Sequence, residues 1–169
     1  MELFSLLGFG VLMVAAVLLY RRWRLRRALW GVVGVPAAFL FKLARVDGPV
    51  NEAERAYIHA FVATFFEKIC KESSKKLDPR WLAPMLQRAE KPLGASEEDD
   101  YIRFLGRHPE MAWQFFDVCC GLAQADGPLV LAESRNIDMV ALFSMLPTDK
   151  YLPILKDLCP DPVADAAAK

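Results

Sequence analysis

The chain lacks the residue patterns on which most enzymes and metal-stapled scaffolds depend. It has only two histidines, His59 and His108, and its four cysteines include no Cys-x-x-Cys spacing. No nucleophile-elbow, phosphate-loop or His-Glu-x-x-His motif occurs in its 169 residues. These absences exclude a disulfide-rich secreted scaffold and the common hydrolase and nucleotide-binding signatures. We therefore expect that the protein is not an enzyme and that its thiols are reduced.

An overall excess of one charge is also missing, because 21 basic side chains balance 21 acidic ones. The charges are nevertheless segregated. The chain beyond the basic cluster has 16 basic and 20 acidic side chains, so nucleic acid is an unsuitable partner for it. We expect the clustered arginines to face lipid headgroups at a membrane surface instead. These arginines are Arg21, Arg22, Arg24, Arg26 and Arg27.

A long uncharged stretch precedes the arginines, from Leu3 to Tyr20. A membrane-crossing helix needs about 20 apolar residues, with a lower limit of about 17. A cleaved secretory signal has its positive charge before the apolar stretch, whereas here Glu2 precedes it and arginines follow. We therefore expect residues 1–27 to form an uncleaved transmembrane anchor, followed by a connector over residues 28–35. The positive-inside rule then places the remainder at the cytoplasmic face of a bacterial inner membrane. A buried N-terminal core helix is the alternative.

Two similar segments lie far apart in the chain, Leu43 to Glu54 and Leu122 to Glu133. Both contain Leu-Ala, then Asp-Gly-Pro, then Ala-Glu at the same spacing, and Ile58 corresponds to Ile137 further on. Glycine just past a helix end and proline after it favour a sharp reversal between two helices. The pattern predicts a helical hairpin used twice.

Sustained alternation of apolar and polar residues, which is typical of half-buried strands, is absent. Apolar residues instead recur at helical spacing through most of the chain after residue 36. We therefore predict an all-α fold, in which a bundle over residues 36–158 contains the two hairpins and a flexible tail covers residues 159–169. The helix from residue 109 to about 125 has so many apolar side chains that we expect it to be the most buried.

The repeated Leu-Ala-x-x-Asp-Gly-Pro-x-x-x-Ala-Glu spacing resembles the TerB-like domain of tellurite-resistance proteins. That domain also forms the N-terminal region of the membrane-anchored co-chaperone DjlA. The resemblance implies a TerB-like helical bundle, and we expect no J-domain here, so chaperone stimulation does not carry over. Four positions match the acidic motif of the family: Asp47, Glu54, Asp126 and Glu133.

Two interpretations of these four carboxylates remain open. If the hairpins pack together, the oxygens form a cluster of the kind that a hard cation such as Ca²⁺ prefers. Alternatively they serve local structure, because Glu54 completes a capping box with Asn51 and each aspartate lies in a turn. Only Glu133 lacks such a local role in the sequence, because Val130 has no capping side chain.

Three functions are compatible with these features. We favour a non-enzymatic, membrane-anchored module that binds a protein partner. The alternatives are a cation-responsive sensor of the tellurite-resistance type and an accessory subunit of a larger membrane complex. The expected partners are membrane lipid and another protein, with self-association through the anchor left open, and the expected cofactor is none or Ca²⁺.

Overall fold

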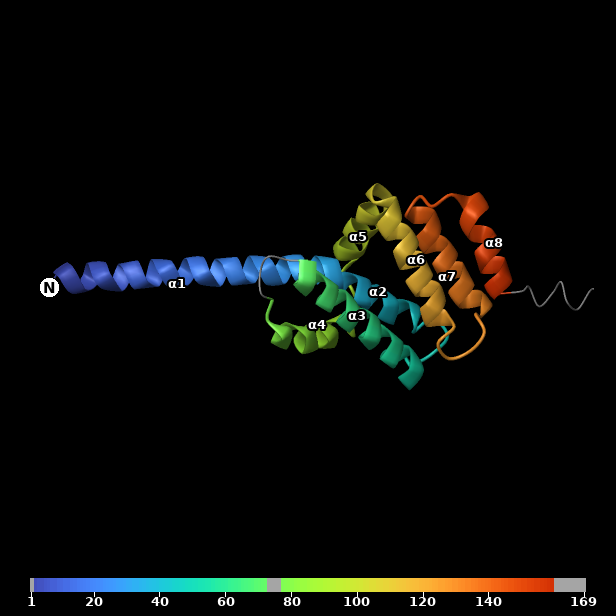
Figure 1. Cartoon of the computed structure of the whole chain (residues 1–169), viewed down its shortest axis with the longest axis horizontal. Coiled ribbons are helices and arrows are strands. Elements are labelled where there is room, and N and C mark those ends of the chain that lie inside the picture. Colours follow the sequence, from blue (N-terminus) through green and yellow to red (C-terminus); the bar gives the residue numbers. More distant parts are fainter. Residues whose placement is uncertain (1, 73–76, 160–169) are drawn as a thin grey trace, which may run out of the picture.

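The first helix of the protein continues directly into the bundle. The structure, a computed structural model, describes residues 2–72 and 77–159, without the side chains of residues 2–15. Helix α1 (Glu2–Leu29) projects away from the other helices, as Figure 1 shows, and leads through a π-helical turn, η1 (Trp30–Gly34), into α2 (Val35–Leu43). Residues 28–35 are therefore helical, whereas the sequence predicted a connector. The amide of Val35 donates to the carbonyl of Trp30, which carries the helix through the extra residue of the π turn.

The structure corrects the prediction of a membrane-spanning helix. Within the part of the chain that the structure describes, no helix is long and apolar enough to cross a bilayer. The described side chains of α1 include five arginines, whereas a span needs about 20 apolar residues in succession. The prediction of a single-pass inner-membrane protein is therefore wrong by this test. Much of the stretch on which it rested, residues 3–15, lies outside the described side chains.

The rest of the described chain is also helical, so the prediction of an all-α fold is confirmed. No strand occurs among residues 2–72 and 77–159. Prolines open η2 and α6, where a missing amide hydrogen costs nothing. Helix α7 ends at Phe143. The remaining elements are α3 (Glu52–Glu72), η2 (Pro79–Trp81), α4 (Leu82–Ala89), α5 (Ala95–Arg107), α6 (Pro109–Ala123), α7 (Leu131–Phe143) and α8 (Thr148–Leu158).

The most buried helix is α2 rather than α6. All residues of α2 except Lys42 are buried, and the helix contacts α3, α4, α5, α6 and α7. Leu40 and Phe41 are fully enclosed. Helix α6 instead buries one face and leaves residues such as Glu110 and Asp117 exposed. Helix α2, which is shorter and less polar than α6, thus occupies the centre of the bundle, because a helix that is apolar on every side has no polar face to expose to solvent.

The two predicted hairpins are present as α2 with α3 and α6 with α7. In Figure 1 the α2–α3 turn and the α6–α7 turn lie at the same end of the bundle. Ile58 of α3 and Ile137 of α7, which correspond in the repeat, are both fully buried. The arrangement brings the two Asp-Gly-Pro turns close to each other.

Candidate functional site

The first acidic group of the site lies at the start of α3. Asn51 is the last residue before the helix, and its side-chain oxygen accepts a hydrogen bond from the amide of Glu54 at 2.9 Å. The Glu54 carboxylate in return accepts from the amide of Asn51 at 2.8 Å. This reciprocal pair is the predicted capping box. It fixes the Glu54 side chain, which is only 2% exposed.

The second group lies at the start of α7 and contains half of the same arrangement. The Glu133 carboxylate accepts from the amide of Val130 at 3.0 Å, and its side chain is also 2% exposed. Val130 has no polar side chain, so it offers no side-chain acceptor to which the amide of Glu133 could donate. Glu133 therefore does have a local role, contrary to the interpretation of the sequence, which considered only the side chain of residue 130.

The fold brings three of the four predicted carboxylates together. Oxygens of Asp47, Glu54 and Glu133 all lie within 4.8 Å of one another. The fourth, Asp126, accepts a hydrogen bond from the side-chain amide of Asn51 at 2.6 Å. The capping residue of the first hairpin thus binds the turn of the second, and this contact joins residues 75 positions apart.

The surroundings of the two buried glutamates disfavour negative charge. Burial is the main cause that raises the pKa of Glu54, with further contributions from Asp126 and Asp47, against the lowering effect of its hydrogen bond from Asn51. Burial likewise raises the pKa of Glu133, opposed by the Val130 amide. A bound cation would reduce the repulsion between these neighbouring carboxylates. Ca²⁺ usually takes six to eight oxygens, so these carboxylates would supply only part of its shell.

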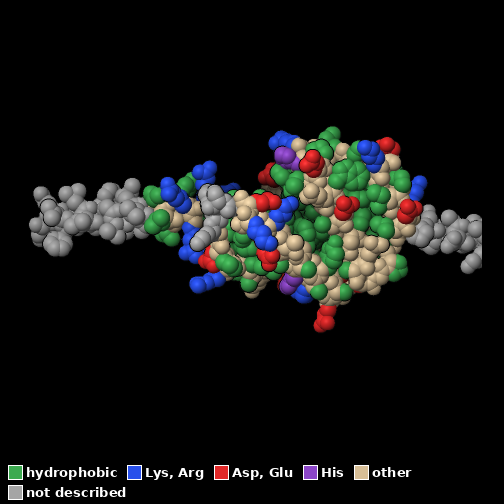
Figure 2. Space-filling model, in the orientation of Figure 1, with side chains coloured by type: hydrophobic (Ala, Val, Ile, Leu, Met, Phe, Trp, Pro, Cys, Tyr) green, Lys and Arg blue, Asp and Glu red, His purple; other side chains and the backbone are tan. Residues whose placement is uncertain are grey.

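The basic cluster of α1 is exposed and has aromatic neighbours. Figure 2 shows Lys and Arg side chains gathered where α1 joins the bundle. Arg22 and Arg26 lie 6.0 and 5.3 Å from the centre of the Trp81 ring, while Arg27 lies 5.4 Å from that of Trp23. Among the described residues, none of the five arginines from Arg21 to Arg27 forms an ion pair. All five arginine side chains are exposed.

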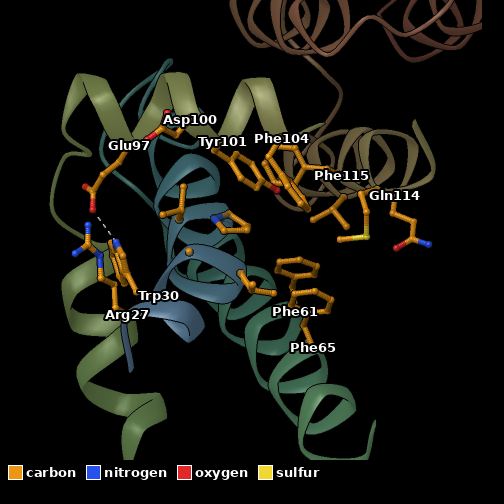
Figure 3. A pocket seen from close by; sticks show the side chains of 16 residues that line it. Arg27, Trp30, Phe61, Phe65, Glu97, Asp100, Tyr101, Phe104, Gln114 and Phe115 are labelled. Atoms are coloured by element: carbon orange, nitrogen blue, oxygen red, sulfur yellow. Dashed lines mark hydrogen bonds between the residues drawn. The ribbon is translucent and has the colours of Figure 1, made fainter. Parts of the chain in front are cut away.

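A hollow that the sequence did not reveal lies beside this cluster. It has a volume of about 510 Å³, within the usual range for ligand and peptide pockets, and its lining is mostly aromatic and aliphatic. Figure 3 shows Phe61 and Phe65 facing Tyr101, Phe104 and Phe115 across it. We call this hollow the apolar groove. Its other lining residues are Arg27, Trp30, Gly31, Val32, Val35, Pro36, Glu97, Asp100, Met111, Gln114 and Val118.

The π turn shapes one end of the groove. The Trp30 indole nitrogen donates to the Glu97 carboxylate at 2.9 Å, and the Arg88 guanidinium lies 3.8 Å from the centre of the indole ring. A Cβ at Gly34 would lie 2.0 Å from that ring, whereas one at Gly31 would meet nothing within 4 Å. Gly34 therefore makes room for Trp30, and Gly31 leaves the groove open. The sequence did not reveal this contact of Trp30 with Glu97, because the two residues are 67 positions apart.

The two adjacent cysteines of α6 lie in surroundings that disfavour a reactive thiolate. Cys119 and Cys120 on α6 are both buried. Burial raises the pKa of the Cys120 thiol to about 12 and that of Cys119 further still. A thiol with such a pKa stays protonated and unreactive at neutral pH.

The comparison with known families covers both hairpins and most of the groove. The family described as "Tellurite resistance protein TerB" matches residues 35–151. The chain belongs to the TerB family. The match extends from the first residue of α2 into α8, so Asp47, Glu54, Asp126 and Glu133 all fall inside it, while α1 and η1 precede it. No curated protein and no solved structure proved similar to the chain.

Proposed function

We propose that this TerB-family protein is a non-enzymatic binding module that holds an apolar segment of a partner protein in the apolar groove. The observation that carries the proposal is the groove itself, a hollow of about 510 Å³ between α3 on one side and α5 with α6 on the other. Val32 and Phe104 at its edge are 47% and 40% exposed. Apolar side chains left in contact with water favour a site that another surface covers.

The residues around the groove support binding rather than chemistry. Its polar side chains are Arg27, Glu97, Asp100 and Gln114, together with the hydroxyl of Tyr101 and the indole nitrogen of Trp30. Glu97 is already engaged by Trp30 and by Arg88, which donates to it at 3.0 Å. Neither histidine of the chain is among the lining residues. The groove thus offers shape and apolar surface, which are the properties of a docking site.

Site-specific photo-crosslinking in cells tests this proposal. A benzophenone amino acid at Val32 should give a partner adduct that disappears when Gly31→Trp fills the groove. Gly31→Ala is the matched control, because its Cβ would meet no neighbour. The same amino acid at exposed Met139, on α7, should not give this adduct. An adduct at Val32 that is unaffected by Gly31→Trp would contradict docking in the groove.

A second candidate function is supported by the three carboxylates within 4.8 Å of one another. In this alternative a divalent cation binds Asp47, Glu54 and Glu133 and stabilises the joined turns of the hairpins. Calorimetric titration with Ca²⁺ should then release heat, and saturating ion should raise the melting temperature. Both responses should vanish in a Glu54→Gln/Glu133→Gln variant. Absence of both in the parent chain would eliminate the alternative.

A further inference from the structure

We propose that the occupant of the apolar groove is an amphipathic helix of a partner protein that carries an acidic turn, and that this turn lies along the arginines of α1. This inference rests on the proposed docking function. It adds the chemistry of the partner and the direction in which the partner leaves the groove.

The walls of the groove have the spacing that a docked helix requires. Phe61 and Phe65 are four residues apart on α3, with parallel rings whose centres lie 5.8 Å apart. Met111 and Phe115 are four apart on α6 and form part of the opposite wall. Rows of this kind accept side chains from positions i, i+4 and i+7 of a guest helix. Val32 at the edge adds further exposed apolar surface.

Both acidic side chains that line the groove already form ion pairs with arginines. Arg88 pairs with Glu97 at 3.0 Å, and Arg103 pairs with Asp100 at 3.5 Å. Arg27 at the α1 end has no carboxylate within ion-pair distance among the described residues. The unbalanced charge of the groove is therefore positive and lies at one end.

This positive charge continues along one side of α1. Arg24 precedes Arg27 by one helical turn, so both lie on the side of α1 that leads into the groove. Tyr20 and Trp23 share this side and stack with ring centres 6.1 Å apart. Arg22 and Arg26 face Trp81 instead. A guest helix that leaves the groove along α1 thus passes over aromatic rings and two arginines, which favours acidic side chains.

A second copy of this chain is a poorer occupant. The exposed apolar side chains nearest to the arginines in such a copy are on α1 itself, where Leu18 and Leu19 are 60% and 67% exposed. That helix contains the same five arginines, which would meet the arginines of the first copy. Like charges in contact oppose association. The positive end of the groove therefore selects a partner of different sequence and opposite charge.

Three matched peptides test the charge of the partner against the full chain. Each has about 18 residues, long enough to hold a helix, with Leu and Phe at positions i, i+4 and i+7. They differ only in one terminal turn, which carries Glu, Gln or Lys, and each is made with that turn at either end. In fluorescence anisotropy the Glu peptide should bind about tenfold or more tightly than the Gln peptide, and high salt should remove most of this difference.

Variants separate charge from shape. Arg24→Glu/Arg27→Glu should abolish the preference for the Glu peptide and favour the Lys peptide. Arg22→Glu/Arg26→Glu makes the same change of net charge on the other side of α1 and should leave the preference in place. Gly31→Trp should weaken all three peptides by at least about tenfold, whereas Gly31→Ala should not.

The outcomes distinguish failure of this inference from failure of the docking function. Equal binding of all three peptides that Gly31→Trp abolishes would overturn the acidic partner and leave groove docking intact. No binding by any peptide, together with binding to phosphatidylglycerol vesicles that persists in Gly31→Trp, would overturn the inference and assign the arginines to a lipid surface. Self-association of the full chain that Gly31→Trp disrupts would overturn it in favour of a second copy.

Discussion

The two hairpins have the same sequence pattern, and they differ at one capping position. The first has Asn51 before α3, and the second has Val130 before α7. Asn51 both caps its own helix and donates to Asp126 of the other hairpin at 2.6 Å. Val130 has no side-chain acceptor for its helix, and its backbone amide donates to Glu133. A duplicated unit has thus become asymmetric through one side chain.

This difference decides which carboxylates gather. Asp126 accepts a hydrogen bond from Asn51, whereas its counterpart Asp47 lies in the cluster with Glu54 and Glu133 and accepts no equivalent bond from residue 130. The set of carboxylates at the end of the bundle where the two turns meet therefore reflects the difference between Asn51 and Val130.

Truncation of the equivalent core residues should have the largest effect. Ile58→Ala and Ile137→Ala should each lower the free energy of unfolding by about 2–5 kcal/mol, because both side chains are fully enclosed and their removal leaves a cavity. Urea denaturation measures the loss. Ile154→Ala on α8, where the side chain is 38% exposed, is the control and should cost much less. A large loss at Ile58 with a minor one at Ile137 would show that the hairpins are not equivalent in the core.

Removal of the first cap should have the next largest effect. Asn51→Ala should cost about 0.5–2 kcal/mol, because the amide of Glu54 loses its acceptor and Asp126 loses its donor. Val130→Ala, at a side chain that is 42% exposed, should change stability little. Equal losses in the two variants, measured by urea denaturation, would indicate that the Asn51 side chain contributes nothing.

Addition of the missing cap should have a smaller effect of opposite sign. Val130→Asn supplies an acceptor for the amide of Glu133 and should stabilise the fold by up to about 1 kcal/mol. Val130→Leu, which adds no acceptor, is the control. Thermal melting followed by circular dichroism should show a rise only for the asparagine variant. A fall in melting temperature would mean that residue 130 cannot adopt the geometry of Asn51.

The pH dependence should show the smallest change. Because the pKa values of Glu54 and Glu133 are raised in the folded state, folding binds protons, and the contribution of these groups to stability declines as pH rises above the usual carboxyl value. Glu54→Gln and Glu133→Gln keep an acceptor oxygen for the capped amide but have no charge. Each variant should therefore gain stability relative to the parent as pH rises from about 4.5 toward neutrality.

Urea titrations at several pH values measure this trend. Glu67→Gln on the exposed part of α3 is a suitable control and should follow the parent. A double Glu54→Gln/Glu133→Gln variant should gain less than the sum of the single variants, because each substitution removes the same mutual repulsion. A variant that loses stability relative to the parent as pH rises would contradict the raised pKa values.

The sequence by itself determined the helices, the two Asp-Gly-Pro turns, the Asn51 capping box and the equivalence of Ile58 with Ile137. Each of these depends on neighbours a few positions away, through hydrogen bonds within a turn or apolar spacing along one helix. The TerB family could also be recognised from the sequence, because its motif lies within the two Asp-Gly-Pro turns. The membrane span was predicted wrongly from an uncharged stretch, since no helix in the described part of the chain is long and apolar enough to cross a bilayer.

Only the tertiary structure decided three features: the burial of α2, the hydrogen bond from Asn51 to Asp126, and the apolar groove. The contact of Asn51 with Asp126 spans 75 positions, and that of Trp30 with Glu97 spans 67. Apolar residues that form a core and those that line a groove have the same spacing along a helix. Which of them meet another helix and which remain open depends on how the helices pack, and that is a property of the assembled bundle.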